Sequence, residues 1–226
     1  MVISELNKYE IIEHLKEMRS PEVSTLDDNR TRLLHYYQHD LTDSYVRQYF
    51  QGTSLQQIPV FTTNFTKRVI DTRSLVYKKP PEVVVDDKYV EYSETLNSKR
   101  RLMERMTFLL GTSAMLTKPN HLWDNGVQEL NYEIIPYFRV FFLRGHDYPC
   151  AVAYPVTNYA ITDTWGKGFN PTVWAVWTAD YEGYKGEHFL FDGKNVIPPM
   201  ENGVTNEDLI NPYGVLPVSF SYRMPR

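Results

Sequence analysis

The stretch from Thr95 to Leu110 reads TLNSKRRLMERMTFLL, and Gly111 follows it. Its apolar residues recur at helical spacing among charged ones, which predicts an amphipathic helix: Leu102, Met106, Leu109 and Leu110. After Gly111 this periodicity stops, and segments rich in Val, Ile, Tyr, Phe and Trp alternate with turn residues. The chain therefore changes from helices to strands near this glycine, and we expect an α+β fold with the helices first.

Three more helices are predicted upstream. They cover Lys8 to Arg19, about Asn29 to Gln51, and roughly Thr63 to Tyr77. Their expected ends are Ser20-Pro21, Gly52 and Pro80-Pro81, because proline and glycine terminate helices. In the third helix, Phe65, Val69 and Ile70 should form one apolar side.

Downstream, turn residues separate five strand-like segments, which predicts a mostly antiparallel sheet region. These segments are Asn131 to Leu143, Cys150 to Asn158, Val173 to Tyr181, His188 to Phe191, and Val215 to Tyr222. A longer loop is expected near residues 159–171.

Composition narrows the function classes. Residues 1–120 hold 17 Lys/Arg, 16 Asp/Glu and 12 aromatic residues, whereas residues 121–226 hold 7, 12 and 20, so the β-rich part is acidic and aromatic. The net charge of -4 argues against a protein that coats nucleic acid with positive surface. Cys150 is the single cysteine, so no internal disulfide forms and a reducing compartment is expected. The sequence also lacks an apolar run long enough for a membrane span and a secretory signal at its start, which predicts a soluble intracellular protein.

Motifs for chemistry are weak. His35 and His39 lie four residues apart on a predicted helix, a spacing that zinc can use, but Tyr36 stands where a metalloprotease has glutamate. Gly166-Lys167-Gly168 lacks the remaining spacing of a phosphate loop. We interpret these as helix histidines and a loop, and predict no catalytic, cofactor-binding or metal-binding residue.

Two other groups leave alternatives open. Cys150 lies in an apolar strand, where a small buried side chain is a simpler interpretation than a nucleophile. Asp180, Glu182 and Glu187 are either an acid/base pair or an acidic sheet edge.

Basic residues cluster on the predicted helices. Lys99, Arg100, Arg101 and Arg105 form one group, and a second group holds Lys67, Arg68 and Arg73. These side chains could contact phosphate or an acidic neighbouring subunit, or they could be the solvated faces of amphipathic helices.

The order of several segments resembles the portal proteins of tailed bacteriophages. Thr66 to Pro81, TKRVIDTRSLVYKKPP, is similar to a portal helix that ends in a proline-rich turn, and Arg101 to Thr112, RLMERMTFLLGT, to the helix leading into the sheet. Asn131–Leu143, Ala151–Val156 and Trp174–Thr178 resemble strands of the portal wing. NPYGVLPV, from Asn211 to Val218, is similar to the Asn-Pro-x-Gly-x-x-Pro turn before the portal stem.

The resemblance implies a non-enzymatic subunit of a dodecameric ring at one capsid vertex. Such a ring serves capsid assembly with scaffold and major capsid protein, DNA packaging with the large terminase subunit, and ejection through head–tail connector proteins, while double-stranded DNA passes through it. The expected location is the virion, and the host cytoplasm during assembly.

The same resemblance assigns residues 1–120 to a helical N-terminal part of the wing and residues 121–226 to its β-rich part, truncated before the stem. The basic group Lys99, Arg100, Arg101 and Arg105 is then expected to meet the acidic Asp180–Glu187 region of a neighbouring subunit, or phosphate. The alternatives are a small metal-dependent hydrolase or nuclease using His35 and His39, and another head–tail adaptor protein.

Overall fold

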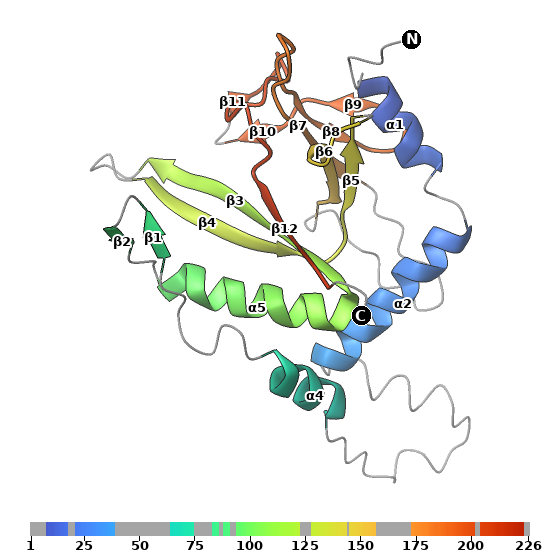
Figure 1. Ribbon diagram of the computed structural model, residues 1–226. Helices are drawn as coiled ribbons and strands as arrows, with labels where there is room; N and C mark the ends of the chain where they lie inside the picture. The colour runs from blue at the N-terminus through green and yellow to red at the C-terminus, as the bar shows by residue number, and fades with distance from the viewer. Residues whose placement is uncertain are drawn as a thin grey trace.

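The computed structural model describes residues 8–17, 21–38, 64–74, 83–85, 88–90, 94–122, 128–143, 145–156, 173–201 and 204–223. Helices precede most of the strands, so the predicted α+β fold is confirmed (Figure 1). The helices are α1 (Lys8–Glu17), α2 (Pro21–Gln38), α4 (Phe65–Arg73) and α5 (Glu94–Leu110). The strands are β1 (Val83–Val85), β2 (Lys88–Val90), β3 (Thr112–Leu122), β4 (Gln128–Ile135), β5 (Arg139–Phe142), β6 (Pro149–Pro155), β7 (Trp174–Thr178), β8 (His188–Phe191), β9 (Val196–Ile197), β10 (Met200–Glu201), β11 (Val204–Thr205) and β12 (Val218–Tyr222).

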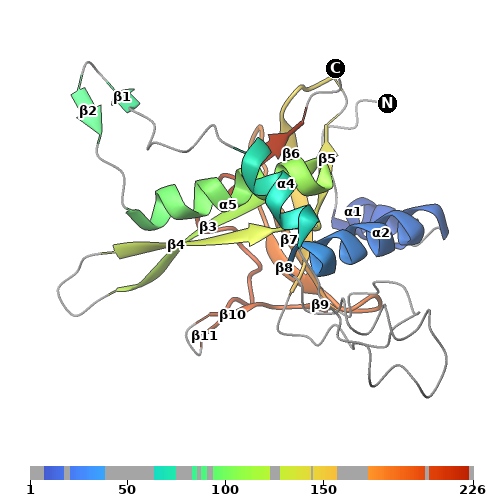
Figure 2. The same cartoon turned by 90° about the horizontal axis from the view of Figure 1, so that it is seen from below.

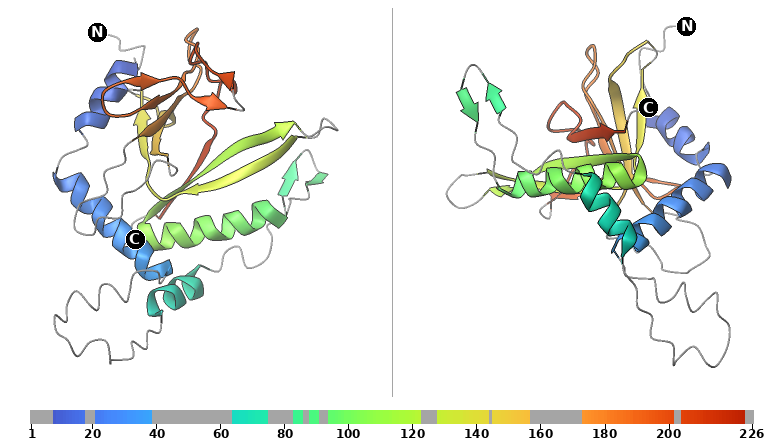
Figure 3. Two further views of the ribbon diagram at one scale, coloured as in Figure 1. Left: turned by 180° about the vertical axis from the view of Figure 1, so that it is seen from behind. Right: turned by 60° about the horizontal axis from the view of Figure 1, so that its bottom comes forward.

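The strands form antiparallel sheets that stack in layers. A five-stranded sheet has the order β5-β6-β7-β8-β9, and a three-stranded sheet has the order β12-β3-β4. Helix α1 covers the outer face of the larger sheet, and α5 lies along the outer face of the smaller one (Figures 1 and 3). The two short hairpins β1-β2 and β10-β11 are separate, and β1-β2 stands away from the body (Figure 2).

The central sheet is apolar on both faces. One face, with Phe141, Ala151, Ala153, Val176 and Phe189, packs against Ile11, Ile12 and Leu15 of α1. The other face, with Val152, Tyr154, Ala175 and Trp177, packs against the three-stranded sheet. Since successive side chains of a strand point to opposite faces, a strand covered on both sides reads as a continuous apolar run, as WAVW does in β7.

Strand β3 lies between α5 on one side and the five-stranded sheet on the other. Its Ala114 and Leu116 face the five-stranded sheet, while Met115 faces Leu96 and Met103 of α5. The sequence did not predict this strand, because TSAMLTKPNHL lacks a run of β-branched or aromatic residues. Its conformation is fixed by pairing with β12 on one side and β4 on the other.

A buried ion pair joins α2 to the central sheet. Asp27 is 4% exposed, and its carboxylate accepts a hydrogen bond from the Arg139 guanidinium at the start of β5. The Tyr137 hydroxyl donates to Thr31 Oγ1 of α2 at 2.9 Å, and burial raises the pKa of Tyr137 to about 12. Polar contacts between buried groups thus set the position of this helix.

Two helix predictions need correction. The second helix begins at Pro21, not near Asn29, because proline fits the first turn of a helix, where its missing N–H has no partner to lose. The third helix was expected to bury an apolar side, but none of its side chains is buried, and Phe65 and Val69 are 68% and 56% exposed. The third helix also ends earlier than expected: Arg73 is its last residue, and Ser74 caps it through its N–H to the Ile70 carbonyl. The expected continuation of the second helix to Gln51 lies outside the described residues, as does the loop near 159–171.

The strand predictions hold with one interruption. The segment Asn131 to Leu143 is two strands, β4 and β5, because residues 136–138 bend the chain from the smaller sheet into the larger. The other four segments contain β6, β7, β8 and β12. Among the described helices, none has both the length and the apolar character needed to cross a membrane.

Candidate subunit interface

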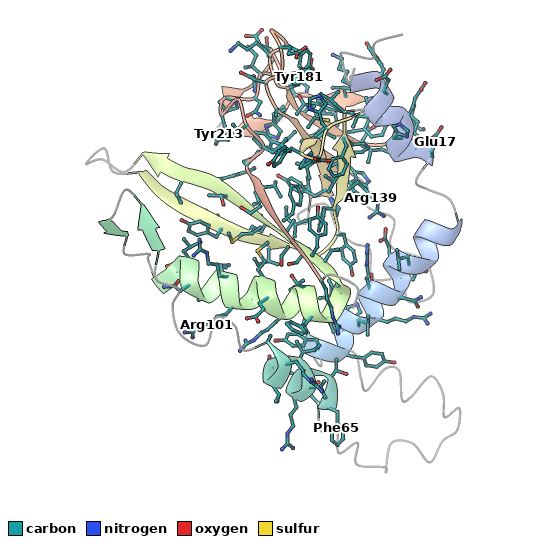
Figure 4. The ribbon with its side chains drawn as sticks, in the orientation of Figure 1. Glu17, Phe65, Arg101, Arg139, Tyr181 and Tyr213 are labelled. Carbon is teal, nitrogen blue, oxygen red and sulfur yellow. The ribbon has the colours of Figure 1, made fainter. Side chains whose placement is uncertain are left out.

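The predicted basic residues lie at different positions around α5. Leu96, Met103, Met106 and Leu110 are buried, whereas Arg101 is exposed and lies on the side of the helix away from β3 and β4 (Figure 4). Lys99 and Arg100 are half-buried, and helical geometry places Lys99 about 160° around the helix from Arg101, on the side of the buried Met103 and Met106. The structure thus does not gather these three cations on one side of α5.

Arg105 has a different position from the rest of its predicted group. Its Nε lies 3.1 Å from Asp71 Oδ1 on α4, and the Tyr37 hydroxyl of α2 donates to the same oxygen at 3.0 Å. Burial, followed by this bond to Asp71, raises the pKa of Tyr37. One carboxylate therefore joins three helices at the corner where their ends meet (Figure 3), and Arg105 is engaged within its own chain.

The short helix α4 is attached at this corner by polar groups. Asn64 caps it by accepting a hydrogen bond from the Lys67 N–H at 2.7 Å, and donates from Nδ2 to the Tyr37 carbonyl at 2.8 Å. At the other end, Ser74 is buried and donates through its hydroxyl to the Ile70 carbonyl at 2.8 Å. The second basic group, Lys67, Arg68 and Arg73, is exposed on this helix.

The acidic residues Asp180, Glu182 and Glu187 belong to the connection between β7 and β8. Asp180 Oδ1 accepts the Gly186 N–H at 2.7 Å, and Lys185 Nζ lies 3.4 Å from Oδ2; the Gly186 N–H lowers the pKa of this exposed carboxyl. Glu187 Oε2 is buried and makes no hydrogen bond to any described group. Glu182 is exposed at the turn. Asp180 thus binds other groups of its own turn, which favours a structural role in the turn over an acid/base pair for these residues.

The NPYG turn is built around one amide side chain. Asn211 is 4% exposed; its Nδ2 donates to the carbonyls of Thr178 at 2.7 Å and Val215 at 3.0 Å, and its Oδ1 accepts from the Tyr213 N–H at 3.0 Å. Gly214 has φ +64°, and a Cβ there would lie 3.0 Å from Asp180 Oδ2. The Asn211 side chain therefore links the end of β7 to the segment that leads into β12, and Gly214 allows the chain to pass close to Asp180.

A stack of aromatic rings lies under this turn, and the sequence did not reveal it. The rings of Trp177 and His188 are 3.4 Å apart and nearly parallel, Tyr213 stacks on Trp177 at 5.8 Å, and Lys118 Nζ lies 5.4 Å from the Trp177 ring. Trp177 is fully buried, and its Nε1 donates to the Tyr154 hydroxyl at 3.0 Å. Burial, and then the Lys118 charge, lowers the pKa of His188 to about 3. Residues from β3, β7, β8 and the turn meet in this stack, so spacing along the chain could not predict it.

The other predicted chemical groups are placed as follows. His35 is half-buried on α2, whereas His39 and Gly166-Lys167-Gly168 lie outside the described residues. Cys150 is partly buried beside the α1 core and donates from Sγ to the Phe141 carbonyl at 3.2 Å. Burial raises the pKa of this thiol, which reduces its thiolate content and agrees with a packing role. In the part of the chain that the structure describes, no three His, Cys, Asp or Glu side chains converge on a common point where a metal could bind.

No protein-family model matches the sequence, and no curated protein is significantly similar to it.

Proposed function

We propose that this chain is a structural, non-enzymatic subunit of a portal-type ring that serves capsid assembly, DNA packaging and DNA ejection. Support comes from the way its portal-like segments pack together. The TKRVIDTR segment forms α4, which contacts α5; RLMERMTFLLGT forms the end of α5 and the turn into β3. Segments that are separated in sequence therefore form one connected body, as parts of a single wing should.

The NPYG turn is the observation that carries the proposal. Its buried Asn211 fixes the start of β12, and β12 then runs back beside β3 until the Arg223 N–H donates to the Gly111 carbonyl at 2.9 Å. The turn thus directs β12 to the corner formed by the ends of α2, α4 and α5 (Figure 1). A rigid turn that returns the chain to one defined corner gives every copy the same surface there, which suits identical subunits that repeat with one geometry.

The interface residues need refinement. Arg101 stays the best candidate for contacts with an acidic neighbouring subunit or with phosphate, because it is exposed on the side of α5 away from β3 and β4 (Figure 4), whereas Lys99 and Arg100 are half-buried. Arg105 is a poorer choice for a test. In an Arg105→Glu variant the new carboxylate would lie next to that of Asp71, because Arg105 Nε is 3.1 Å from Asp71 Oδ1. The repulsion between the two carboxylates would disturb folding as well as assembly.

Sedimentation of the purified chain tests the proposal. A portal-type subunit should form a large discrete oligomer, and an Arg101→Glu variant should shift that oligomer toward smaller species while keeping the circular dichroism spectrum of the native chain. The metal-dependent hydrolase or nuclease alternative predicts a small species with stoichiometric zinc or manganese and metal-dependent cleavage. A small species with that metal content and activity would refute the proposal.

A further inference from the structure

Helix α4 exposes an apolar stripe formed by two of its side chains. Phe65 and Val69, one helical turn apart, are 68% and 56% exposed. Phe65 points away from the body of the protein (Figure 4). The opposite side of the helix carries Asp71 and Ile70, which are half-buried toward α2 and α5. The helix is therefore attached by polar bonds and presents its apolar residues to solvent, which is the reverse of the usual arrangement.

Two arginines flank this stripe. On a helical wheel Arg68 lies on one side of Phe65 and Val69, and Arg73 lies on the other. Both are exposed, and neither forms an ion pair with a carboxylate of the described residues. An apolar centre bordered by arginines is typical of a protein contact surface.

An acidic surface lies far from α4, in the turn that precedes β12. In this turn, Glu207 and Asp208 are exposed, and so are Ile210 and Val215, at 47% and 62%. Asn206 Nδ2 donates to the Ile210 carbonyl at 2.8 Å, and Asn211 Nδ2 holds the Val215 carbonyl, so this surface is firmly built. Tyr213 of the same turn lies far from Phe65 on α4 (Figure 4).

We propose that the α4 stripe of one copy docks on the Glu207–Val215 turn of a second copy. Phe65 and Val69 would contact Ile210 and Val215, while the arginines face Glu207 and Asp208. Charge complementarity favours this occupant: two arginines that pair with no carboxylate of the described residues flank the stripe, and the turn exposes two acidic and two apolar side chains. Because the two surfaces lie at different ends of the molecule, the contact is heterologous, and its repetition closes a ring or extends a filament. The inference rests on the proposed function and names the surfaces that would join its subunits.

Matched charge reversals test the contact by sedimentation of the full chain. Arg68→Glu should weaken self-association roughly tenfold or more, because it places a carboxylate against the acidic turn. Lys67→Glu is the control, since it makes the same charge change on the adjacent residue of the helix but outside the stripe. Phe65→Ala should weaken association with no loss of folded structure, because its side chain is exposed in the single chain.

Mixing complementary variants identifies the partner surface. A chain with Arg68→Glu and Arg73→Glu, and a chain with Glu207→Lys and Asp208→Lys, should each associate poorly alone and form the native oligomer together. Equal effects of Arg68→Glu and Lys67→Glu, or no recovery on mixing, would overturn the inference.

The results also separate this inference from the proposed function. If the native chain forms rings that none of these variants changes, the ring stands and the α4 contact is refuted. If the native chain forms an open filament or a small oligomer that Arg68→Glu dissociates and mixing restores, the contact stands and the ring is refuted. A native chain that stays monomeric at every concentration refutes both.

Discussion

Acid should destabilise this fold through His188, and the structure sets the size of the effect. The His188 imidazole is buried against the Trp177 ring, and Lys118 lies near that indole ring. A proton on the imidazole would therefore be shielded from solvent and repelled by the lysine charge. Its pKa is lowered from 6.5 to about 3 in the folded chain. Because the unfolded chain binds the proton more tightly, the stability contribution of neutral His188 is complete above pH 6.5 and is lost as the pH falls toward 3.

The magnitude follows from the two pKa values. One pKa unit corresponds to about 1.4 kcal/mol, so the full loss is about 5 kcal/mol and the loss at pH 5 is about 2 kcal/mol. Other groups titrate over the same range, so the measurement must be a difference between two chains. His188→Phe keeps a flat ring against Trp177 and removes the titration.

The assay is urea unfolding at several pH values, followed by tryptophan fluorescence. Between pH 7 and pH 5 the native chain should lose about 2 kcal/mol more unfolding free energy than His188→Phe. Phe191→Leu, a change in a buried neighbour on the same strand, is the control and should run parallel to the native chain at all pH values. Parallel curves for the native chain and His188→Phe would refute the reasoning.

Three further predictions concern stability, and urea unfolding at neutral pH checks each of them. Arg139→Met should lower the free energy of unfolding by about 3 kcal/mol, because it leaves the buried Asp27 carboxylate without its main partner. Adding Asp27→Leu should recover much of that loss, whereas equal stability of Arg139→Met and the native chain would contradict the ion-pair account. Gly186→Ala should lower the free energy of unfolding by about 3 kcal/mol, since the new Cβ would lie 2.4 Å from a backbone carbonyl oxygen of β7. In Gly183→Ala the new Cβ meets nothing within 4 Å, so this variant should lose only about 1 to 2 kcal/mol, because of its φ of +89°. Asn211→Ala should cost about 3 kcal/mol by leaving two carbonyls without their donor, and a loss below about 0.5 kcal/mol would show that the turn does not depend on this amide.

The sequence predicted best what depends on local pattern. The helix expected over Thr95 to Leu110 is α5 within one residue, because its apolar side chains recur at helical spacing. Its buried side was predicted only in part: Met106 and Leu110 are buried as expected, whereas Leu102 and Leu109 are half-buried. The strand His188 to Phe191 is found with the expected bounds for the same reason. In contrast, β3 contains Lys118 and Pro119 and owes its extended form to the two strands beside it, which lie elsewhere in the chain.

The candidate interface shows the same limit. Charge and spacing placed Lys99, Arg100, Arg101 and Arg105 near one another on a helix, but they could not show that Asp71, 34 residues before Arg105, binds that side chain. Apolar periodicity likewise suggested that Phe65 and Val69 face inward, whereas α4 is held by the polar groups of its other side. Which side of a helix is buried is decided by its partners, and these come together only in the fold.

The central claim is that this chain repeats around a closed ring, and electron microscopy of the purified chain tests it most directly. The account predicts uniform ring-shaped particles with a central opening, in which neighbouring copies are joined from α4 to the Glu207–Val215 turn. Particles no larger than a single 26.6 kDa chain, at concentrations where the fold is intact, would contradict it.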